Sequence, residues 1–551
     1  MLIPPTPLRT KASKAKPGLL SRHKRLRWLV ICVLFFAAVS IRMYHIDSSA
    51  TEWYPERQYY SAWGARCMYY SSLDSIPDWR KDVIEAYPRM VDYADNSGMM
   101  APLPTIEGIA RLLYSLAGGE YMWLPRAFSA LAWVLGGVFL YLLAKRLMSK
   151  EAALLATGFY LLLPAGITGG RSFQVEPLMV AAMICSVYAI FLHHEKPTAR
   201  RVLVAASVAA VAVLTRPLCA FMIFGAFVAL SLKRRGLRRA MRDPHSWLFA
   251  SIAVLPTAIL ILYDRLFPFS SSMTYFEGST VQPHLLLHWD YYFQWAYYFL
   301  SVIGSWGISG AVQILAGLVT LGAAVVGATI LRKKDARPLV IGLSCGFVAF
   351  GIVFTYLISN HHYHQLQMVP VIALCLGPIA VRILTWVYAL VADLIGPKWV
   401  SRVAVGGILF VLVIPMVGVV ADDAMRSAEL GRERGVEAQT IGELVEHSTD
   451  VVVISHWRGY DLTYHGWFFG HWLLWETPAL QGADVVHMES FFDSLCEGWQ
   501  PTYLVITDLE ELDRHSVLRQ FLFATYPTVA QADAYLILNL QESLGSPGDP
   551  S

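Results

Sequence analysis

The chain has 551 residues, of which 56% are hydrophobic and only 15% are charged. Soluble globular domains carry about 25% charged residues, so most of this chain is expected to lie in a membrane. The formal net charge is +3, and the positive charge is concentrated in short connectors. No connector combines a basic stripe with interleaved aromatic residues, which argues against a protein that binds nucleic acid.

Residues 1–26 are predicted to form a disordered, basic cytosolic tail, because they combine several prolines with Lys and Arg. The apolar run that follows lacks a small-residue cleavage site, so we interpret it as an uncleaved first span. About twenty apolar residues cross a bilayer. The candidate spans are 28–44, 122–146, 151–168, 175–193, 202–215, 217–232, 247–263, 310–331, 339–359, 368–391 and 403–420.

The connectors between these spans alternate in character. Basic clusters lie at 22–27, 145–150, 194–201, 233–242 and 332–337, and connectors rich in acidic residues, aromatic residues, His and Pro lie at 44–104, 169–176, 264–290 and 359–367. Cytoplasmic loops carry the Lys and Arg excess. We therefore predict a multi-pass plasma (inner) membrane protein with a cytoplasmic N-terminus and all unusual chemistry on the extracytoplasmic side.

Two segments outside the spans are long enough to fold. The first external loop, 45–120, is rich in Tyr, Trp and Pro, and we expect two or three helices along the membrane surface, including 57–70 and 105–116. After the membrane domain of residues 27–421, residues 422–545 alternate short apolar strands at 451–454, 503–506 and 535–538 with helix-like stretches such as 433–447. The predicted fold is an α-helical polytopic membrane protein of about 11–13 spans with a small external C-terminal α/β domain, followed by a disordered end at 546–551.

Glu52 and Glu56 open the first external loop among aromatic residues. Partial desolvation there raises a carboxylate pKa toward that of a useful general base. The alternative is that both acids cap a surface helix, since Pro55 followed by Glu56 is typical of a first helical turn.

Three charged residues lie at the external ends of later spans. Arg171 is suited to planar, bidentate contacts with phosphate or carboxylate, and the alternative is an internal pair with Glu176, which precedes Pro177 at a helix start. Arg216 follows an apolar run and meets Pro217. Such a cation is either functional or extends outward to the interface.

The sequence Asn-His-His-Tyr-His-Gln at 360–365 is the densest polar cluster between two spans. His361 and His364 are three residues apart and can share a helical face with their neighbours. A metal site is one interpretation, but no carboxylate lies nearby to complete it. We favour hydrogen bonds to a phosphate or sugar, with ordinary interfacial histidines as the alternative. The aromatic stretch 456–475 either stacks on sugars or anchors the C-terminal domain to the membrane.

In this order and on this side of the membrane, the segments resemble the GT-C class of membrane glycosyltransferases, in the branch of protein O-mannosyltransferases and lipid A aminoarabinose transferases. The resemblance covers most of the membrane portion. It rests on the acids Glu52 and Glu56 and on Tyr59, Arg171 and Glu176. It also rests on the short segments 41–42 (IR), 65–66 (AR), 101–104 (APLP), 214–217 (LTRP) and 362–370 (HYHQLQMVP). The adjacent Asp-Glu pair that is common in the family is missing, so the base is either Glu52 or Glu56. We favour Glu56, because it lies next to the segment Arg57-Gln58-Tyr59.

The resemblance implies an inverting transfer of a sugar from a polyprenyl- or dolichyl-phosphate donor to an acceptor hydroxyl outside the cytosol. Physically, this chemistry needs a base near the acceptor and cations on the phosphate. The roles implied are Glu56 or Glu52 as base, Arg171, Arg216, Arg57 and His364 on the phosphate, and Glu176, Tyr59, His361 and Tyr363 as substrate-orienting residues. No nucleotide is expected, no cofactor is certain, and some relatives in the wider class use a divalent cation.

Two other classes of protein remain as alternatives. A secondary transporter would also span the membrane many times, but such proteins usually show repeated halves, and we find no internal repeat. A non-enzymatic envelope receptor or scaffold would retain its function when Glu52 and Glu56 are both neutralised.

Overall fold

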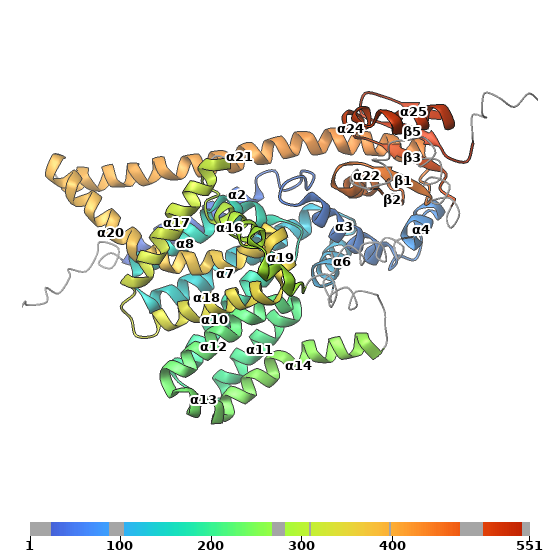
Figure 1. Cartoon of the computed structure of the whole chain (residues 1–551). Coiled ribbons are helices and arrows are strands. Elements are labelled where there is room, and N and C mark those ends of the chain that lie inside the picture. The colour runs from blue at the N-terminus through green and yellow to red at the C-terminus, as the bar shows by residue number, and fades with distance from the viewer. Residues whose placement is uncertain are drawn as a thin grey trace, which may run out of the picture.

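A computed structural model describes residues 24–86, 104–266, 281–307, 310–395, 398–473 and 500–542. Figure 1 shows a large helical bundle beside a small α/β unit, with the long helix α21 (Lys398–Leu444) running from one to the other. The predicted helical fold with a C-terminal α/β portion is confirmed. The protein is an integral multi-pass membrane protein.

Within the described ranges, eight helices are long and apolar enough to cross a membrane, or nine if one bent pair counts as a span. The eight are α2 (Lys24–Met43), α7 (Trp123–Leu147), α10 (Glu176–Glu195), α12 (Ala220–Arg235) with η2 (Pro217–Cys219), α14 (Pro244–Leu266), α17 (Gly310–Ile330), α18 (Ala336–Val353) and α20 (Val369–Ile395) with η4 (His362–Met368). The remaining two of the eleven predicted spans lie in the 17-residue helix α11 (Ala199–Thr215) and in the first half of α21.

Prolines set two of the breaks between membrane helices. The bent pair consists of α8 (Lys150–Leu162) and α9 (Pro164–Thr168) with η1 (Gly169–Arg171), and its parts meet at 70°. Leu163 is extended because the proline ring that follows disfavours helical geometry at the preceding residue. Arg216 is extended before Pro217 for the same reason, as the sequence predicted.

The first external loop contains α3 (Pro55–Tyr70), α4 (Asp78–Glu85) and α6 (Thr105–Ala117), so the expected two or three helices are confirmed. Every residue of α3 from 58 to 67 is buried, which differs from the expected surface helix. The reason is that α6 packs on one side of α3 and α22 (Tyr460–Gly466) on another. The shorter connecting helices are α13 (Leu237–Arg242), η3 (Pro283–Leu287), α16 (Trp289–Ile303) and α19 (Thr355–Asn360).

The C-terminal portion is built on a five-stranded sheet of order β2-β1-β3-β5-β4. The strands are β1 (Val451–Ile454), β2 (Gly470–Trp472), β3 (Tyr503–Ile506), β4 (Thr528–Gln531) and β5 (Leu536–Asn539). In register, Val451 of β1 lies opposite Tyr503 of the parallel β3, and Tyr503 lies opposite Asn539 of the antiparallel β5. Three of these strands match the predicted ones. The turn η5 (His456–Gly459) and α22 follow β1, and α24 (Leu509–Arg514) and α25 (Ser516–Thr525) follow β3.

Helix α21 holds the C-terminal unit in place over α3. The predicted domain boundary at 421–422 lies inside this continuous 47-residue helix. At its far end, α21 approaches α22 so closely that a Cβ on Gly442 would lie 1.9 Å from the carbonyl oxygen of Gly466. Only glycine permits this approach, and it brings α22 against α3.

Candidate active site

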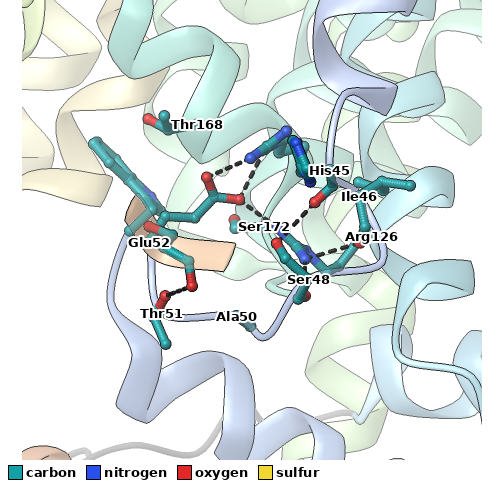
Figure 2. Close-up of polar contacts among 12 residues, drawn as sticks. His45, Ile46, Ser48, Ala50, Thr51, Glu52, Arg126, Thr168 and Ser172 are labelled. Atoms are coloured by element: carbon teal, nitrogen blue, oxygen red, sulfur yellow. Dashed lines mark hydrogen bonds and ion pairs between the residues drawn. The ribbon is translucent and has the colours of Figure 1, made fainter. Parts of the chain in front are cut away.

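The loop before α3 carries the first of two buried charge clusters. The Glu52 carboxylate accepts hydrogen bonds from Arg171, with Nε 2.8 Å from Oε1 and Nη2 2.5 Å from Oε2, and a further one from Arg126 Nη2. Figure 2 shows Glu52 and Arg126 facing each other across the loop. We call Glu52, Arg126 and Arg171 the Glu52 cluster.

The remaining donors of the Glu52 cluster hold the backbone of the loop. Arg126 Nη1 donates to the carbonyl oxygens of Ile46 (2.9 Å) and Ser48 (2.6 Å), both visible in Figure 2. Arg171 Nη1 donates to Tyr44 O at 2.5 Å. The alternative prediction that Arg171 pairs with Glu176 is wrong, because Nε and Nη2 of Arg171 bind the Glu52 carboxylate and Nη1 binds backbone carbonyl oxygens. The cluster ties the loop to α7 and η1.

A second carboxylate, Glu176 at the start of α10, is also fully buried between two arginines. Its Oε1 atom lies 3.6 Å from Arg57 Nη1 and 3.4 Å from Arg216 Nη2. Neither Glu176 oxygen forms a hydrogen bond with the described part of the chain, and neither does Arg216 Nη1. We call Glu176, Arg57 and Arg216 the Glu176 cluster.

The polar segment η4 supplies the wall of the Glu176 cluster. The Tyr363 ring centroid lies 4.4 Å from the guanidinium carbon of Arg57. His364 is completely buried, and neither of its ring nitrogens has a hydrogen-bond partner among the described residues. The His361 ring centroid lies 6.1 Å from that of His364. Burial, assisted by the charge of Arg57, lowers the pKa of His361 to about 3, so this ring is neutral at pH 7.

Glu107 on α6 is a third acid near the Glu176 cluster, and sequence reasoning missed it. Its carboxylate accepts a hydrogen bond from the Ser61 hydroxyl at 2.6 Å. Burial raises the pKa of Glu107, although the charges of Arg57 and Arg216 oppose that rise. Its position in the first turn of α6 resembled an ordinary helix-dipole contact, so no local signal distinguished it.

Glu56 lies in the first turn of α3, is only partly exposed, and forms no hydrogen bond or ion pair with a described residue. Tyr54, which lies two residues before Glu56, has a left-handed backbone (φ 56°), and its hydroxyl lies 2.7 Å from His362 Nδ1. Tyr54 also contacts Tyr363, with ring centroids 4.8 Å apart. Glu56 is therefore an unpartnered carboxylate beside the wall of the Glu176 cluster.

The structure thus divides the predicted site residues into three groups. The Tyr59 hydroxyl lies 3.0 Å from His465 Nε2 on α22. Glu52 and Arg171 bind each other. The residues that gather at the Glu176 cluster are Glu56, Arg57, Glu176, Arg216, His361, Tyr363 and His364.

The Glu176 cluster suits an anion better than a cation. Two guanidinium groups face one carboxylate, so the cluster keeps a net positive charge, and arginine forms bidentate contacts with phosphate. In the part of the chain that the structure describes, no group of three or more His, Cys, Asp or Glu side chains is arranged to hold a metal ion.

Comparison with known proteins agrees with this architecture. Residues 101–263 match the family model of dolichyl-phosphate-mannose-protein mannosyltransferases. The chain is similar to the crystal structure of ArnT from Cupriavidus metallidurans in the apo state, with 15% identity, 94% of this chain and 98% of that chain covered, and a TM-score of 0.56. The chain has the GT-C fold.

Two further structures are similar to this GT-C chain. ArnT from Cupriavidus metallidurans bound to undecaprenyl phosphate has 15% identity over 95% of this chain and 99% of that chain, with a TM-score of 0.53. The Archaeoglobus fulgidus oligosaccharyltransferase in complex with Zn and sulfate has 12% identity over 92% of this chain and 73% of that chain, with a TM-score of 0.52. No curated protein sequence matches the chain. The fold predicted from the family resemblance is confirmed.

Proposed function

We propose that this protein is an inverting membrane glycosyltransferase, which moves a sugar from a polyprenyl- or dolichyl-phosphate donor to an acceptor hydroxyl. The matching family is named for a dolichyl-phosphate sugar donor, and ArnT has been crystallised with undecaprenyl phosphate. Those properties belong to the relatives. In this chain, the Glu176 cluster is the observation that supports the proposal.

The Glu176 cluster has the charge and the vacant hydrogen-bonding capacity that a phosphate needs. Arg57 and Arg216 lie 3.6 and 3.4 Å from Glu176, too far for strong hydrogen bonds, and Arg216 Nη1 is buried without a partner among the described residues. A buried, unsatisfied polar group is costly unless a ligand satisfies it. The phosphate of the sugar donor would accept hydrogen bonds from these N–H groups. We therefore assign Arg57 and Arg216 as the residues that bind it.

The chemical step follows from these positions. The acceptor oxygen attacks the anomeric carbon, the bond from that carbon to the phosphate oxygen breaks, and the acceptor proton passes to the Glu56 carboxylate. The phosphate leaves with an additional negative charge, which Arg57 and Arg216 stabilise. The neutral His361, and His364 with its two unpartnered ring nitrogens among the described residues, form hydrogen bonds with the phosphate or the sugar. Attack opposite the leaving group inverts the anomeric configuration.

Glu52 and Arg171 have a positioning role in this proposal. Their mutual hydrogen bonds fix the loop that leads into α3, and α3 carries Glu56 and Arg57. Tyr59 supports α3 through its contact with His465. The proposed organisation is a catalytic membrane domain at 27–421 with a cytoplasmic N-terminus, and an extracytoplasmic domain at 422–545.

The test uses purified full-length protein in lipid nanodiscs, a membrane extract as acceptor source, and radiolabelled polyprenyl-phosphate mannose, glucose, arabinose and aminoarabinose. Transfer and donor hydrolysis are measured for the wild type, Glu56→Gln and Glu52→Gln. A general base contributes roughly 10²–10⁴-fold. We expect such a loss in Glu56→Gln, while Glu52→Gln retains activity per folded molecule.

Two results would count against the proposal. Absence of donor binding and turnover in the wild type with all four donors would reject the transferase. Full activity of Glu56→Gln with loss in folded Glu52→Gln would keep the transferase and move the base to Glu52.

A further inference from the structure

The turn η5 of the C-terminal unit has an unusual backbone. Trp457 (φ 49°), Arg458 (φ 59°) and Gly459 (φ 65°) are three successive residues in the left-handed region. Two of them carry side chains that disfavour this conformation, and such strain is concentrated at functional sites. The strained turn therefore points to a use for the side chain at its centre.

The surroundings of η5 hold the turn in this strained form. The Trp457 ring centroid lies 4.3 Å from the guanidinium carbon of Arg434 on α21, and Arg434 Nη1 donates to Asp461 Oδ2 at 3.1 Å. A Cβ on Gly459 would lie 2.6 Å from Val453 Cγ1 of β1, so the third position accepts only glycine. Arg458 itself contributes to none of these contacts.

Arg458 has buried donor capacity that no described residue uses. Its guanidinium carbon lies 4.5 Å from the Trp472 ring centroid, and its Nη1 atom is buried without a hydrogen-bond partner among the described residues. The neighbouring Tyr460 is only 2% exposed. Arg458 thus contacts both Trp472 and Tyr460 and keeps one buried donor, Nη1, without a hydrogen-bond partner among the described residues.

The turn η5 lies against α3, the helix that carries the proposed base. In Figure 1, α22 and the first strands lie next to α3, and both η5 and α22 contact α3. Tyr60 lies one helical turn after Glu56, on the same face of α3, and its ring centroid is 6.1 Å from that of Tyr460. Burial chiefly raises the pKa of Tyr460, while Arg458 lowers it and Glu56 raises it further, so both charges act on this phenol.

Arg458 lies in η5, which contacts α3, and Glu56 lies one turn before Tyr60, which contacts Tyr460. Among the described residues, no ion pair joins Glu56 and Arg458. Arg458 also belongs to a different part of the chain from Arg57 and Arg216, which we assign to the donor phosphate. An anion next to the attacked hydroxyl would use the Nη1 donor of Arg458, and the partly exposed Trp472 would contact a sugar ring.

We propose that Arg458 binds an anionic group, a phosphate or a carboxylate, on a saccharide acceptor whose neighbouring hydroxyl is deprotonated by Glu56. This inference rests on the proposed function. The C-terminal unit then selects the acceptor, while the membrane helices bind the donor.

The experiment uses the full chain in lipid nanodiscs with a radiolabelled polyprenyl-phosphate sugar. The acceptor probes are N-acetylglucosamine, its 6-phosphate, glucose and glucuronic acid. Occupation of the acceptor site is scored either as transfer to the probe or as protection of the donor from hydrolysis. We expect both anionic probes to act at concentrations about tenfold or more below those of their neutral counterparts, since a charge-assisted hydrogen bond has that effect. Preference for only one anion would identify it as phosphate or carboxylate.

Arg458→Gly is the decisive variant, because glycine accepts the left-handed backbone that arginine resists. We expect the melting temperature to stay the same or rise, donor hydrolysis to remain, and the tenfold preference to disappear. Asparagine also tolerates the left-handed backbone, so Arg458→Asn should show the same results as Arg458→Gly. Arg519→Gln, at an exposed arginine on α25, is the matched control and should keep the preference.

Two results would overturn the inference. Equal occupation by charged and neutral probes in the wild type, including failure of all four to bind, would reject an anion site. A preference that survives in Arg458→Gly would reject Arg458 as its residue. Absence of donor hydrolysis in the wild type would instead reject the proposed function.

Discussion

The Glu52 cluster and the Glu176 cluster have the same composition, one buried glutamate between two arginines, but they differ in geometry. In the Glu52 cluster, Arg171 donates to both carboxylate oxygens at 2.8 and 2.5 Å, and Arg126 donates as well. In the Glu176 cluster, the nearest nitrogen atoms are 3.4 and 3.6 Å away, and no hydrogen bond forms. The charged groups of the Glu52 cluster are hydrogen-bonded to each other, and those of the Glu176 cluster are not.

This difference separates a structural role from a binding role. Breaking a buried pair with good hydrogen bonds leaves an uncompensated charge, so it destabilises the fold. A buried pair without hydrogen bonds contributes less to stability and retains donors for a ligand. Buried charge alone therefore does not distinguish the two clusters in this chain. We propose that the Glu176 cluster has the binding role, because its hydrogen bonds are not made within the cluster.

Among the residues of the two clusters, the largest expected effect is on catalysis, from Arg216→Gln. Removing one donor that stabilises developing charge typically lowers the rate by about 10²–10³-fold. We expect this loss in sugar transfer, with little change in thermal unfolding, since Arg216 makes no hydrogen bond to Glu176. The measurement is the single-turnover rate in nanodiscs, together with the melting temperature. Arg171→Gln is the comparator, and it should show the opposite pattern. If both variants lost activity equally without loss of stability, the two clusters would not differ in role.

The next effect is on stability, from Glu52→Gln. This change leaves Arg126 and Arg171 buried without the carboxylate that accepts their hydrogen bonds, and breaking a buried ion pair costs about 3–5 kcal/mol. The free energy of unfolding in mixed micelles should fall by this amount. Glu85→Gln on α4, where the glutamate pairs with Lys81 at an exposed site, should change it by less than about 1 kcal/mol. Equal stability of the two variants would contradict the structural role of Glu52.

A third prediction concerns product binding in Glu176→Gln. The Glu176 carboxylate competes with a phosphate for Arg57 and Arg216, and a nearby like charge changes a desolvated anion's free energy by about 1.4 kcal/mol or more. Polyprenyl phosphate should therefore inhibit this variant at concentrations about tenfold lower than the wild type. Weaker inhibition would mean that Glu176 mainly positions the two arginines.

The fold could be predicted from the sequence to the extent that its signals are local. Apolar runs located the helices, and Pro217 marked a break that the structure confirms. The bend before Pro164 lies inside the predicted span 151–168 and was missed. The strands β2 and β4 were missed because they are short edge strands in which no apolar run appears. Their pairing depends on neighbours that lie elsewhere in the chain.

The site was predictable as a set of residue types but not as a set of partners. Arg171 finds Glu52 119 positions away, and Arg126 finds the same carboxylate 74 positions away. Ser61 and Glu107 are 46 positions apart. Such pairs are fixed by how the helices pack, which no local spacing encodes. Arg126, Glu107 and Arg458 therefore became candidates only when the structure was known.

The smallest effect expected concerns Glu107, whose charge acts on both arginines of the Glu176 cluster. Burial raises the pKa of Glu107, so its negative charge appears at a higher pH than in an ordinary carboxylate. That charge weakens the attraction of Arg57 and Arg216 for a phosphate. Inhibition by polyprenyl phosphate should thus be strongest below the raised pKa and weaken, by about fivefold at most, as pH increases through it. Glu107→Gln should remove this component of the pH profile and bind as the wild type does at low pH. If the pH profile of inhibition kept its shape in Glu107→Gln, groups other than Glu107 would set the charge near the Glu176 cluster.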